Sequence, residues 1–306
     1  MSSLESMVIA VDGEAKCGKT TVITAIADEA EFQAGIIPDL LREEDSNPYA
    51  GIVPRLSGLK ALQEAYSFNN ITAISAGNFF RAATQLVIEQ ENKGVNKSYF
   101  DKKDLAAVIG ILSSDGAVDF LQTDVGIESR VGKVGKLVGV QALCGSAFVH
   151  ALTNAYHNDG GGNLVIVDAR QPLEWLKRND ALGQGAGEVK PSTIMPIYID
   201  TPAEVAARRM LGDFNANLER IESRRFEDAT RDEYPVEKPT EFIESDLIRW
   251  FKQFIVHERT VEELALPFKL VNDEDLSLSN IKYFASLVAT GAQDAAMHLH
   301  AQSHNR

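Results

Sequence analysis

The chain has 306 residues and a formal net charge of -14 at pH 7, with 44% hydrophobic and 24% charged residues. This size and composition are ordinary for a soluble globular protein with a full core and argue against extensive disorder. The acidic balance argues against broad nucleic-acid binding, which needs many Lys and Arg to neutralise phosphates. No apolar run is long enough to span a bilayer. Residues 1–6 have no basic and apolar secretory pattern, so we expect a cytoplasmic protein without a membrane partner.

One glycine-rich stretch near the N-terminus organises the sequence. Residues 13–20 are GEAKCGKT and fit the pattern G-x-x-x-x-G-K-[ST]. The apolar run 7–11 before it predicts a buried strand, and the helical spacing of apolar residues over 21–30 predicts a helix after it. Gly13 and Gly18 allow a tight turn that brings backbone N–H groups up to phosphate oxygens. The motif therefore predicts a binding site for ATP with Mg²⁺.

The side chains of this stretch suit separate tasks. Lys19 can reach the β- and γ-phosphates, the Thr20 hydroxyl can hold Mg²⁺, and Thr21 supports the helix, whose N-terminus carries partial positive charge. The predicted ATP-binding residues are Gly13, Glu14, Ala15, Lys16, Cys17, Gly18, Lys19, Thr20 and Thr21. The alternative, a glycine-containing turn that binds nothing, is disfavoured by the full match between a strand and a helix. Cys17 and Cys144 are expected to be free thiols.

Apolar runs and helical periodicity alternate along the rest of the chain. We predict strands at residues 71–75, 163–168, 194–200 and 267–272, and a short strand and turn at 118–129. We predict helices at residues 56–66, 77–91, 101–112, 138–156, 202–211, 217–226, 241–264 and 278–290. Residues 33–70 form an excursion of weak periodicity, and the tail 293–306 has no order signal. This alternation predicts a three-layer α/β fold, in which helices cover both faces of a parallel sheet and ligands bind at the carboxyl ends of its strands.

Five stretches, in chain order, resemble the cytidylate kinase branch of the nucleoside monophosphate kinases, which are P-loop kinases. They are residues 8–21 (VIAVDGEAKCGKTT), 74–81 (ISAGNFFR), 165–170 (VIVDAR), 197–211 (IYIDTPAEVAARRML) and 221–235 (IESRRFEDATRDEYP). The resemblance implies a P-loop NTPase fold and a single kinase domain over residues 1–306, with an acceptor-binding (NMP-binding) segment at 97–145 and a lid at 208–235. Segments 33–70 and 241–264 are then extra material.

The resemblance also implies roles for particular side chains. Arginine suits phosphate binding because its planar fork pairs bidentately with phosphate oxygens. The acceptor monophosphate is expected to contact Ser75, Gly77, Arg81, Arg130, Arg170 and Asp228, and the donor phosphates Arg208 and Arg224. The catalytic set is expected to comprise Lys19, Arg170, Asp228 and Arg231, and the metal ligand is Thr20. From the residues alone, the lid arginines could instead form a solvated helix face, and Asp168 could be either a strand-end cap or an active-site carboxylate.

The sequence departs from the family pattern on the acceptor side. Ser75-Ala76 stands where the family has Asp-[Ser/Thr], and Ala169 and Gln171 replace a Gly and an Asp. The expected reaction is ATP-dependent phosphorylation of a pyrimidine nucleoside monophosphate, with CMP or dCMP favoured, to the diphosphate. The alternatives are another small-molecule acceptor, or an ATP-binding regulatory protein without kinase activity. The expected partners are small nucleotides, and the expected state is a monomer, although the sequence leaves oligomerisation open.

Overall fold

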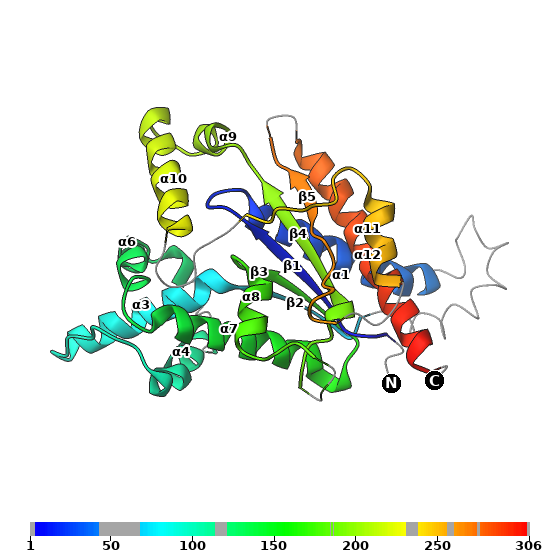
Figure 1. Ribbon diagram of the computed structural model, residues 1–306, viewed down its shortest axis with the longest axis horizontal. Helices are drawn as coiled ribbons and strands as arrows, with labels where there is room; N and C mark the ends of the chain where they lie inside the picture. The colour runs from blue at the N-terminus through cyan, green and yellow to red at the C-terminus, as the bar shows by residue number, and fades with distance from the viewer. Residues whose placement is uncertain are drawn as a thin grey trace.

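A five-stranded parallel sheet forms the centre of the molecule (Figure 1). The computed structural model describes residues 4–42, 68–113, 121–183, 185, 187–230, 238–255, 260–273 and 276–304. The strands are β1 (Met7–Gly13), β2 (Asn70–Ser75), β3 (Asn163–Asp168), β4 (Ile194–Asp200) and β5 (Phe268–Val271). They lie in the order β2-β3-β1-β4-β5 and pair in parallel throughout. All five lie where strands were predicted, and β3 and β4 have the predicted bounds.

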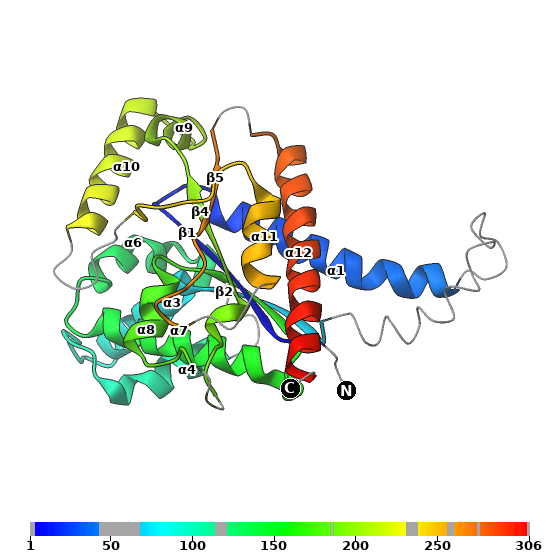
Figure 2. The same cartoon turned by 45° about the vertical axis from the view of Figure 1, so that its right-hand side comes forward.

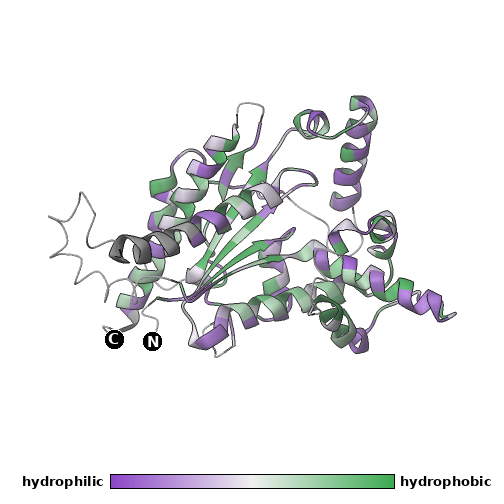
Figure 3. Ribbon diagram, turned by 180° about the vertical axis from the view of Figure 1, so that it is seen from behind, coloured by the Kyte–Doolittle hydropathy of each residue, from purple (hydrophilic) through white to green (hydrophobic). Residues whose placement is uncertain are grey.

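Alternate side chains of the central strand enter two separate cores. Met7 and Ile9 pack with helices α1 (Lys19–Arg42), α11 (Leu247–Ile255) and α12 (Leu278–His304) on one face of the sheet. Val8 and Ala10 point to the other face. Such continuous burial is typical of a parallel strand covered on both sides. Figure 3 shows the resulting band of hydrophobic strands between the helices, and the predicted α/β arrangement is confirmed.

Among the described residues, the core on the second face is built with helices α3 (Ala76–Asn92), α4 (Leu105–Leu112), α6 (Val125–Val134), α7 (Val140–His157) and α8 (Pro172–Arg178). Phe148 of α7 packs edge-on against both Phe79 and Trp175, with ring centroids 6.2 and 5.2 Å away. Single turns of 3₁₀ helix occur at Lys102–Asp104, Asn158–Gly160 and Pro191–Thr193. The helix pair α9 (Ala203–Arg208) and α10 (Phe214–Ala229) stands apart at the carboxyl edge of the sheet (Figure 1).

The predicted strand and turn at residues 118–129 is wrong over its described part. Residues 121–123 are helical, and α6 begins at Val125. Asp124 caps α6, because its Oδ1 accepts a hydrogen bond from the Ile127 N–H at 2.8 Å. Ile127 is buried in the second core. The cap and this buried contact therefore favour a helix where local composition indicated a strand.

The predicted helix at residues 241–264 is shorter in the structure. Only α11, Leu247–Ile255, is helical among the described residues of this range. Ile243 instead forms a parallel bridge with Phe268, donating to the Pro267 carbonyl and accepting from the Lys269 N–H. Residues 238–246 thus pass along the outer edge of the sheet.

The chain's last segment is helical where no order was expected. Helix α12 continues past residue 293 to His304. Ala292, Ala295 and Ala296 are buried, and α12 runs beside α11 (Figure 2). Helix α1 likewise extends beyond residue 30 to Arg42, whereas the predicted helix 56–66 lies outside the described residues. Among the helices that the structure describes, none combines the length and apolar character needed to cross a membrane.

Candidate functional site

The glycine-rich loop joins β1 to α1 at the carboxyl edge of the sheet, as predicted. Gly13 and Gly18 have φ angles of +146° and +94°, which residues other than glycine rarely adopt. A Cβ on Gly13 would lie 2.6 Å from the Ile199 carbonyl oxygen of β4. The first glycine is therefore required both by its backbone conformation and by its contact with the neighbouring strand.

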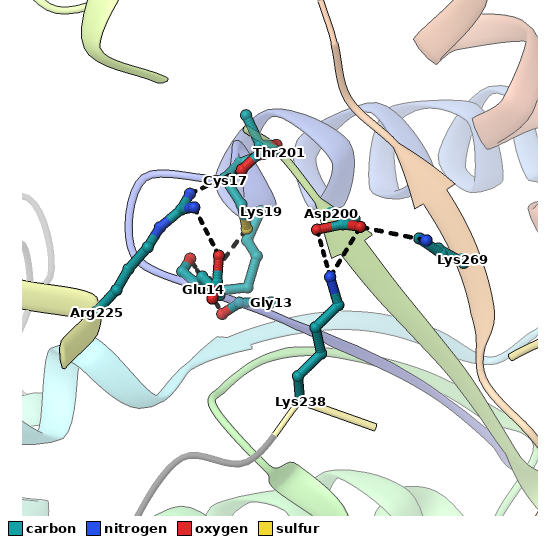
Figure 4. A network of polar contacts seen from close by, with 9 residues as sticks. All are labelled: Gly13, Glu14, Cys17, Lys19, Asp200, Thr201, Arg225, Lys238 and Lys269. Carbon is teal, nitrogen blue, oxygen red and sulfur yellow. Dashed lines mark hydrogen bonds and ion pairs between the residues drawn. The ribbon is translucent and has the colours of Figure 1, made fainter. Parts of the chain in front are cut away.

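The Lys19 side chain folds back across this loop (Figure 4). Its ammonium group donates to the carbonyls of Gly13 and Glu14 at 2.8 and 3.1 Å. Thr20 and Thr21 are exposed on the first turn of α1, and this turn contains no acidic residue. The mouth of the loop is thus lined by an ammonium group, hydroxyl groups and the N-terminus of a helix, a combination that favours anions.

Asp12 supports the loop from below. Its Oδ1 accepts a hydrogen bond from the Gly13 N–H at 2.6 Å. Burial raises the pKa of this carboxyl, although the Gly13 N–H, the Lys19 charge and the Gln171 N–H act in the opposite direction. Gln171 has a φ of +51° at the N-cap of α8. Its backbone N–H is directed at the Asp12 carboxylate at the end of β1.

Two side chains from neighbouring strand ends hold the base of the loop. Thr201, after β4, and Asn272, after β5, donate to the Cys17 carbonyl at 2.9 and 2.7 Å. Arg209, which follows α9, donates to the Asn272 Oδ1 at 2.9 Å. The sequence analysis gave no role to Thr201 or Asn272, and it considered Arg209 only as one of the lid arginines. The available signal was a polar residue at, or directly after, the end of a predicted strand, since such residues gather at the carboxyl edge. Cys17 and Cys144 are free and buried, as expected.

Helix α10 contacts the loop through an arginine that the sequence analysis did not assign. The Arg225 guanidinium lies 2.7 Å from the Glu14 carboxylate and donates to the Thr201 carbonyl at 2.8 Å (Figure 4). Its neighbour Arg224, which was expected at the donor phosphates, lies 3.6 Å from the Asp228 carboxylate. Helical spacing alone cannot distinguish two adjacent arginines, because the answer depends on how the helix is rotated against the loop.

Asp228 lies at the centre of a charged group on the inner side of α10. It is 3% exposed and forms an ion pair with Arg170, which follows β3. Glu227 reaches Lys136, after α6, at 3.3 Å. Helix α10 therefore bridges the glycine-rich loop, the end of β3 and the second-face helices. Arg231, which was expected beside Asp228, lies outside the described residues.

The predicted acceptor-side residues fall into two places. Ser75 donates to the Asp168 carboxylate at 3.3 Å, and a Cβ on Gly77 would lie 2.9 Å from an Arg81 nitrogen. These four residues thus cluster near the ends of β2 and β3.

The other predicted acceptor arginine, Arg130 of α6, pairs with a residue farther along α3. Arg81 pairs with Glu128 at 3.4 Å, whereas Arg130 pairs with Glu91 at 2.6 Å. Glu91 is ten residues beyond Arg81 on the same helix, about 15 Å at the usual helical rise. The Arg208 side chain donates to the Glu204 carbonyl of its own helix at 3.4 Å. The contacts of Arg81, Arg170, Arg224 and Arg225 thus lie near the sheet edge, whereas Arg130 pairs farther along α3.

A further charged group lies beside the loop at the end of β4. Lys238 reaches both Asp200 oxygens at 2.9 Å, and Lys269 lies 3.3 Å from the same carboxylate (Figure 4). Burial opposes ionisation of Asp200, but hydrogen bonds and charges from the two lysines outweigh it and lower the pKa. This group attaches the segment that follows the predicted lid to β4 and β5.

The described residues contain no cluster of three or more His, Cys, Asp or Glu side chains that could hold a metal. At the loop, the side chain that the sequence analysis predicted as a ligand of Mg²⁺ is the Thr20 hydroxyl. The arrangement as a whole is a glycine-rich loop at the carboxyl edge of the sheet, with helix α10 packed against it through Arg225. No protein-family model and no curated protein matches the chain.

Proposed function

We propose that this protein is a P-loop phosphotransferase that uses ATP·Mg²⁺. The observation that carries the proposal is the G-x-x-x-x-G-K-T loop between the central strand β1 and helix α1. The chain passes from β1 to β2 and β3 on one side and to β4 and β5 on the other. Such a switch point at the carboxyl edge of a parallel sheet is the general position of nucleotide sites in open α/β folds.

The side chains present fit a triphosphate and its metal. The loop N–H groups and the Lys19 ammonium would bind the donor phosphates, and the exposed Thr20 hydroxyl would hold Mg²⁺. The bound metal supplies charge neutralisation for the phosphoryl group. Arg170, near the end of β3, is suited to stabilise charge between donor and acceptor. Helix α10, linked to the loop by Arg225 and Glu14, would help to exclude water, which otherwise competes as an acceptor.

The acceptor that we favour is a pyrimidine nucleoside monophosphate, CMP or dCMP, converted to the diphosphate. The cluster of Ser75, Gly77 and Arg81 beside Asp168 supports this choice, because it combines a phosphate-binding guanidinium with hydroxyl and carboxylate groups near the proposed donor site. The departures at Ser75-Ala76 and at Gln171 affect the groups that would contact pentose and base. They bear on the choice of acceptor more than on the reaction class.

Two ion pairs favour a second candidate, an ATP-binding regulatory protein without monophosphate kinase activity. Arg81 and Arg130 are paired with Glu128 and Glu91. An acceptor phosphate would have to compete with these carboxylates for the two guanidinium groups. In this candidate the loop and Lys19 bind ATP, while the α3–α6 pair acts as a structural unit.

The test is ADP formation from ATP·Mg²⁺ with a panel of CMP, dCMP, UMP, dUMP, AMP, GMP and TMP. The first proposal predicts acceptor-dependent ADP, fastest with CMP or dCMP, together with the matching diphosphate product. Silence across the panel while ATP binds would contradict it and favour the regulatory candidate. Glu128→Gln and Glu91→Gln serve as matched variants, because each releases one arginine and should lower the acceptor KM if that arginine binds the acceptor.

A further inference from the structure

The peptide between Cys17 and Gly18 is held from outside the glycine-rich loop. The Cys17 carbonyl accepts hydrogen bonds from the Thr201 hydroxyl at 2.9 Å and from the Asn272 amide at 2.7 Å. Thr201 and Asn272 are 1% and 3% exposed, so both bonds are made away from water. A buried carbonyl with two buried donors has its direction firmly set.

The direction of this carbonyl also sets the direction of the next N–H. In a trans peptide the C=O and N–H bonds lie in one plane and point in opposite directions. Because the Cys17 oxygen is turned toward the ends of β4 and β5, the Gly18 N–H is turned away from them. An N–H group with this direction can donate to a phosphate held in the loop.

Asn272 also fits closely against the loop. A Cβ on Gly18 would lie 2.5 Å from the Asn272 side-chain nitrogen. The second glycine of the motif is therefore matched in shape to this asparagine. Hydrogen bonding and packing independently join the two residues.

The opposite end of the Asn272 amide faces the helix pair α9–α10. Its oxygen accepts from the Arg209 guanidinium at 2.9 Å, and Arg209 also donates to the Asp273 carbonyl at 2.5 Å. The orientation of the amide is chemically defined, because arginine only donates and a carbonyl only accepts. One buried side chain thus connects the segment after α9 to the glycine-rich loop.

We propose that Thr201 and Asn272 are positioning residues that aim the Gly18 N–H at bound phosphate, and that Asn272 couples Arg209 to the loop. This inference rests on the proposed function, since it assigns these residues to the same phosphate site. When Arg209 is in place, it polarises and fixes the Asn272 amide, which in turn fixes the Cys17–Gly18 peptide. Displacement of Arg209 would loosen the peptide and weaken the grip on phosphate.

Substitutions can test separately the two hydrogen bonds of the Asn272 amide, one to Arg209 and one to the Cys17 carbonyl. Asn272→Asp keeps an oxygen for Arg209 but places an acceptor against the Cys17 carbonyl. Arg209→Ala removes the other contact and leaves the amide in place. Thr201→Val removes the hydroxyl with almost no change of shape, and Thr201→Ser keeps the hydroxyl as a matched control. ATP·Mg²⁺ affinity is measured by calorimetric titration, and the melting temperature of each variant is measured alongside.

We expect Asn272→Asp and Thr201→Val each to weaken ATP·Mg²⁺ binding about tenfold, the scale of one lost buried hydrogen bond. Thr201→Ser should retain the wild-type affinity. Arg209→Ala should weaken binding less, by about threefold. Added to Asn272→Ala in a double variant, it should weaken binding no further than Asn272→Ala does alone.

Either of two results would overturn this inference while leaving the proposed function intact. In the first, Thr201→Val and Asn272→Asp bind ATP·Mg²⁺ as tightly as a wild-type protein that binds it well. In the second, Thr201→Ser loses as much affinity as Thr201→Val. If the wild-type protein itself does not bind ATP·Mg²⁺, the proposed function fails and the inference fails with it. Thr201→Val is nearly isosteric, so it keeps the test decisive even if Asn272→Asp does not fold.

Discussion

Arg225 of α10 lies 2.7 Å from Glu14 of the glycine-rich loop and also donates to the backbone carbonyl of Thr201. The Arg225 side chain is 16% exposed, so this contact is largely shielded from solvent. Helix α10 is therefore packed against the loop through a charged hydrogen bond that removal of one side chain would break.

Arg225→Ala is expected to release α10 from the loop. The contact ties the helix to the sheet edge, so amide hydrogen exchange along Phe214–Ala229 should become about tenfold faster. The exposed Arg220 lies on the same helix, and Arg220→Ala is the control that should leave exchange unchanged. Equal exchange in wild type and Arg225→Ala would contradict the contact's role in holding α10.

Gly18→Ala should damage the loop more than an ordinary glycine substitution. Gly18 has a φ of +94°, and a Cβ added there would lie 2.5 Å from the Asn272 side-chain nitrogen, whereas Gly94 has a φ of +77° and a Cβ there would meet nothing within 4 Å. In both variants an alanine must adopt a left-handed backbone conformation, which costs about 1 kcal/mol, but only Gly18→Ala adds a steric clash. Denaturant unfolding should therefore give a loss of about 2–3 kcal/mol for Gly18→Ala and about 1 kcal/mol for Gly94→Ala. Equal losses of unfolding free energy would show that the loop and Asn272 can move apart to accommodate the added methyl group.

Asp200 should make the stability of the folded protein depend on pH. Burial opposes its ionisation, but Lys238 and Lys269 lower its folded pKa below the ordinary value of 3.8. The ionised carboxylate thus stabilises the fold above about pH 4, and this stabilisation is lost as the pH falls through the lowered pKa. Asp200→Asn should lower the melting temperature by about 2 °C at about pH 7 and by progressively less toward about pH 3.

Lys238→Met is the partner variant for Asp200→Asn. It removes the side chain that reaches both carboxylate oxygens and leaves Lys269 in place. It should therefore reproduce part of the loss at neutral pH and little of it in acid. A melting-temperature difference that is the same at all pH values would argue against the ion pair as its cause.

Asp228→Ala should destabilise the protein beyond the effect of a surface ion pair. It removes a buried carboxylate that faces Arg170 and Arg224, whose side chains are 23% and 40% exposed. Because solvent partly screens these arginines, the expected loss of unfolding free energy is about 2 kcal/mol rather than the full value for a buried pair. Glu227→Ala on the same helix breaks a pair with the exposed Lys136 and should cost less than about 1 kcal/mol. Similar losses for the two variants would mean that Asp228 is not structurally central.

The sequence predicted the strands well because their signal is local. Residues 163–168 and 194–200 are continuous apolar runs, as strands covered on both faces must be, and they form β3 and β4 with those bounds. The continuation of the last helix carried a weaker signal that was missed. Ala285 and Ala289 of the predicted helix are followed at helical spacing by Ala292 and Ala296, and all four are buried. Small residues contribute little to apolar periodicity, although they allow helices to pack closely.

The site was only partly predictable. The glycine-rich loop is one contiguous pattern, so its residues could be named together with their roles. Arg225 and Asn272 reach the loop from positions 211 and 255 residues beyond Glu14 and Cys17, respectively. Their contacts depend on the rotation of α10 and on the order of strands in the sheet. No short pattern encodes either of these features.

The most direct test of the account is calorimetric titration of the wild-type protein and Lys19→Ala with ATP·Mg²⁺. Lys16→Asn is the matched control, because it keeps the backbone N–H that the loop would offer to phosphate, tolerates the φ of +61° and removes only an exposed lysine side chain of the same loop. We predict saturable binding by wild type, a loss of about a hundredfold for Lys19→Ala at an unchanged melting temperature, and a small effect of Lys16→Asn. Absence of binding by folded wild-type protein, or equal affinity in Lys19→Ala, would contradict the assignment of this loop as the phosphate site.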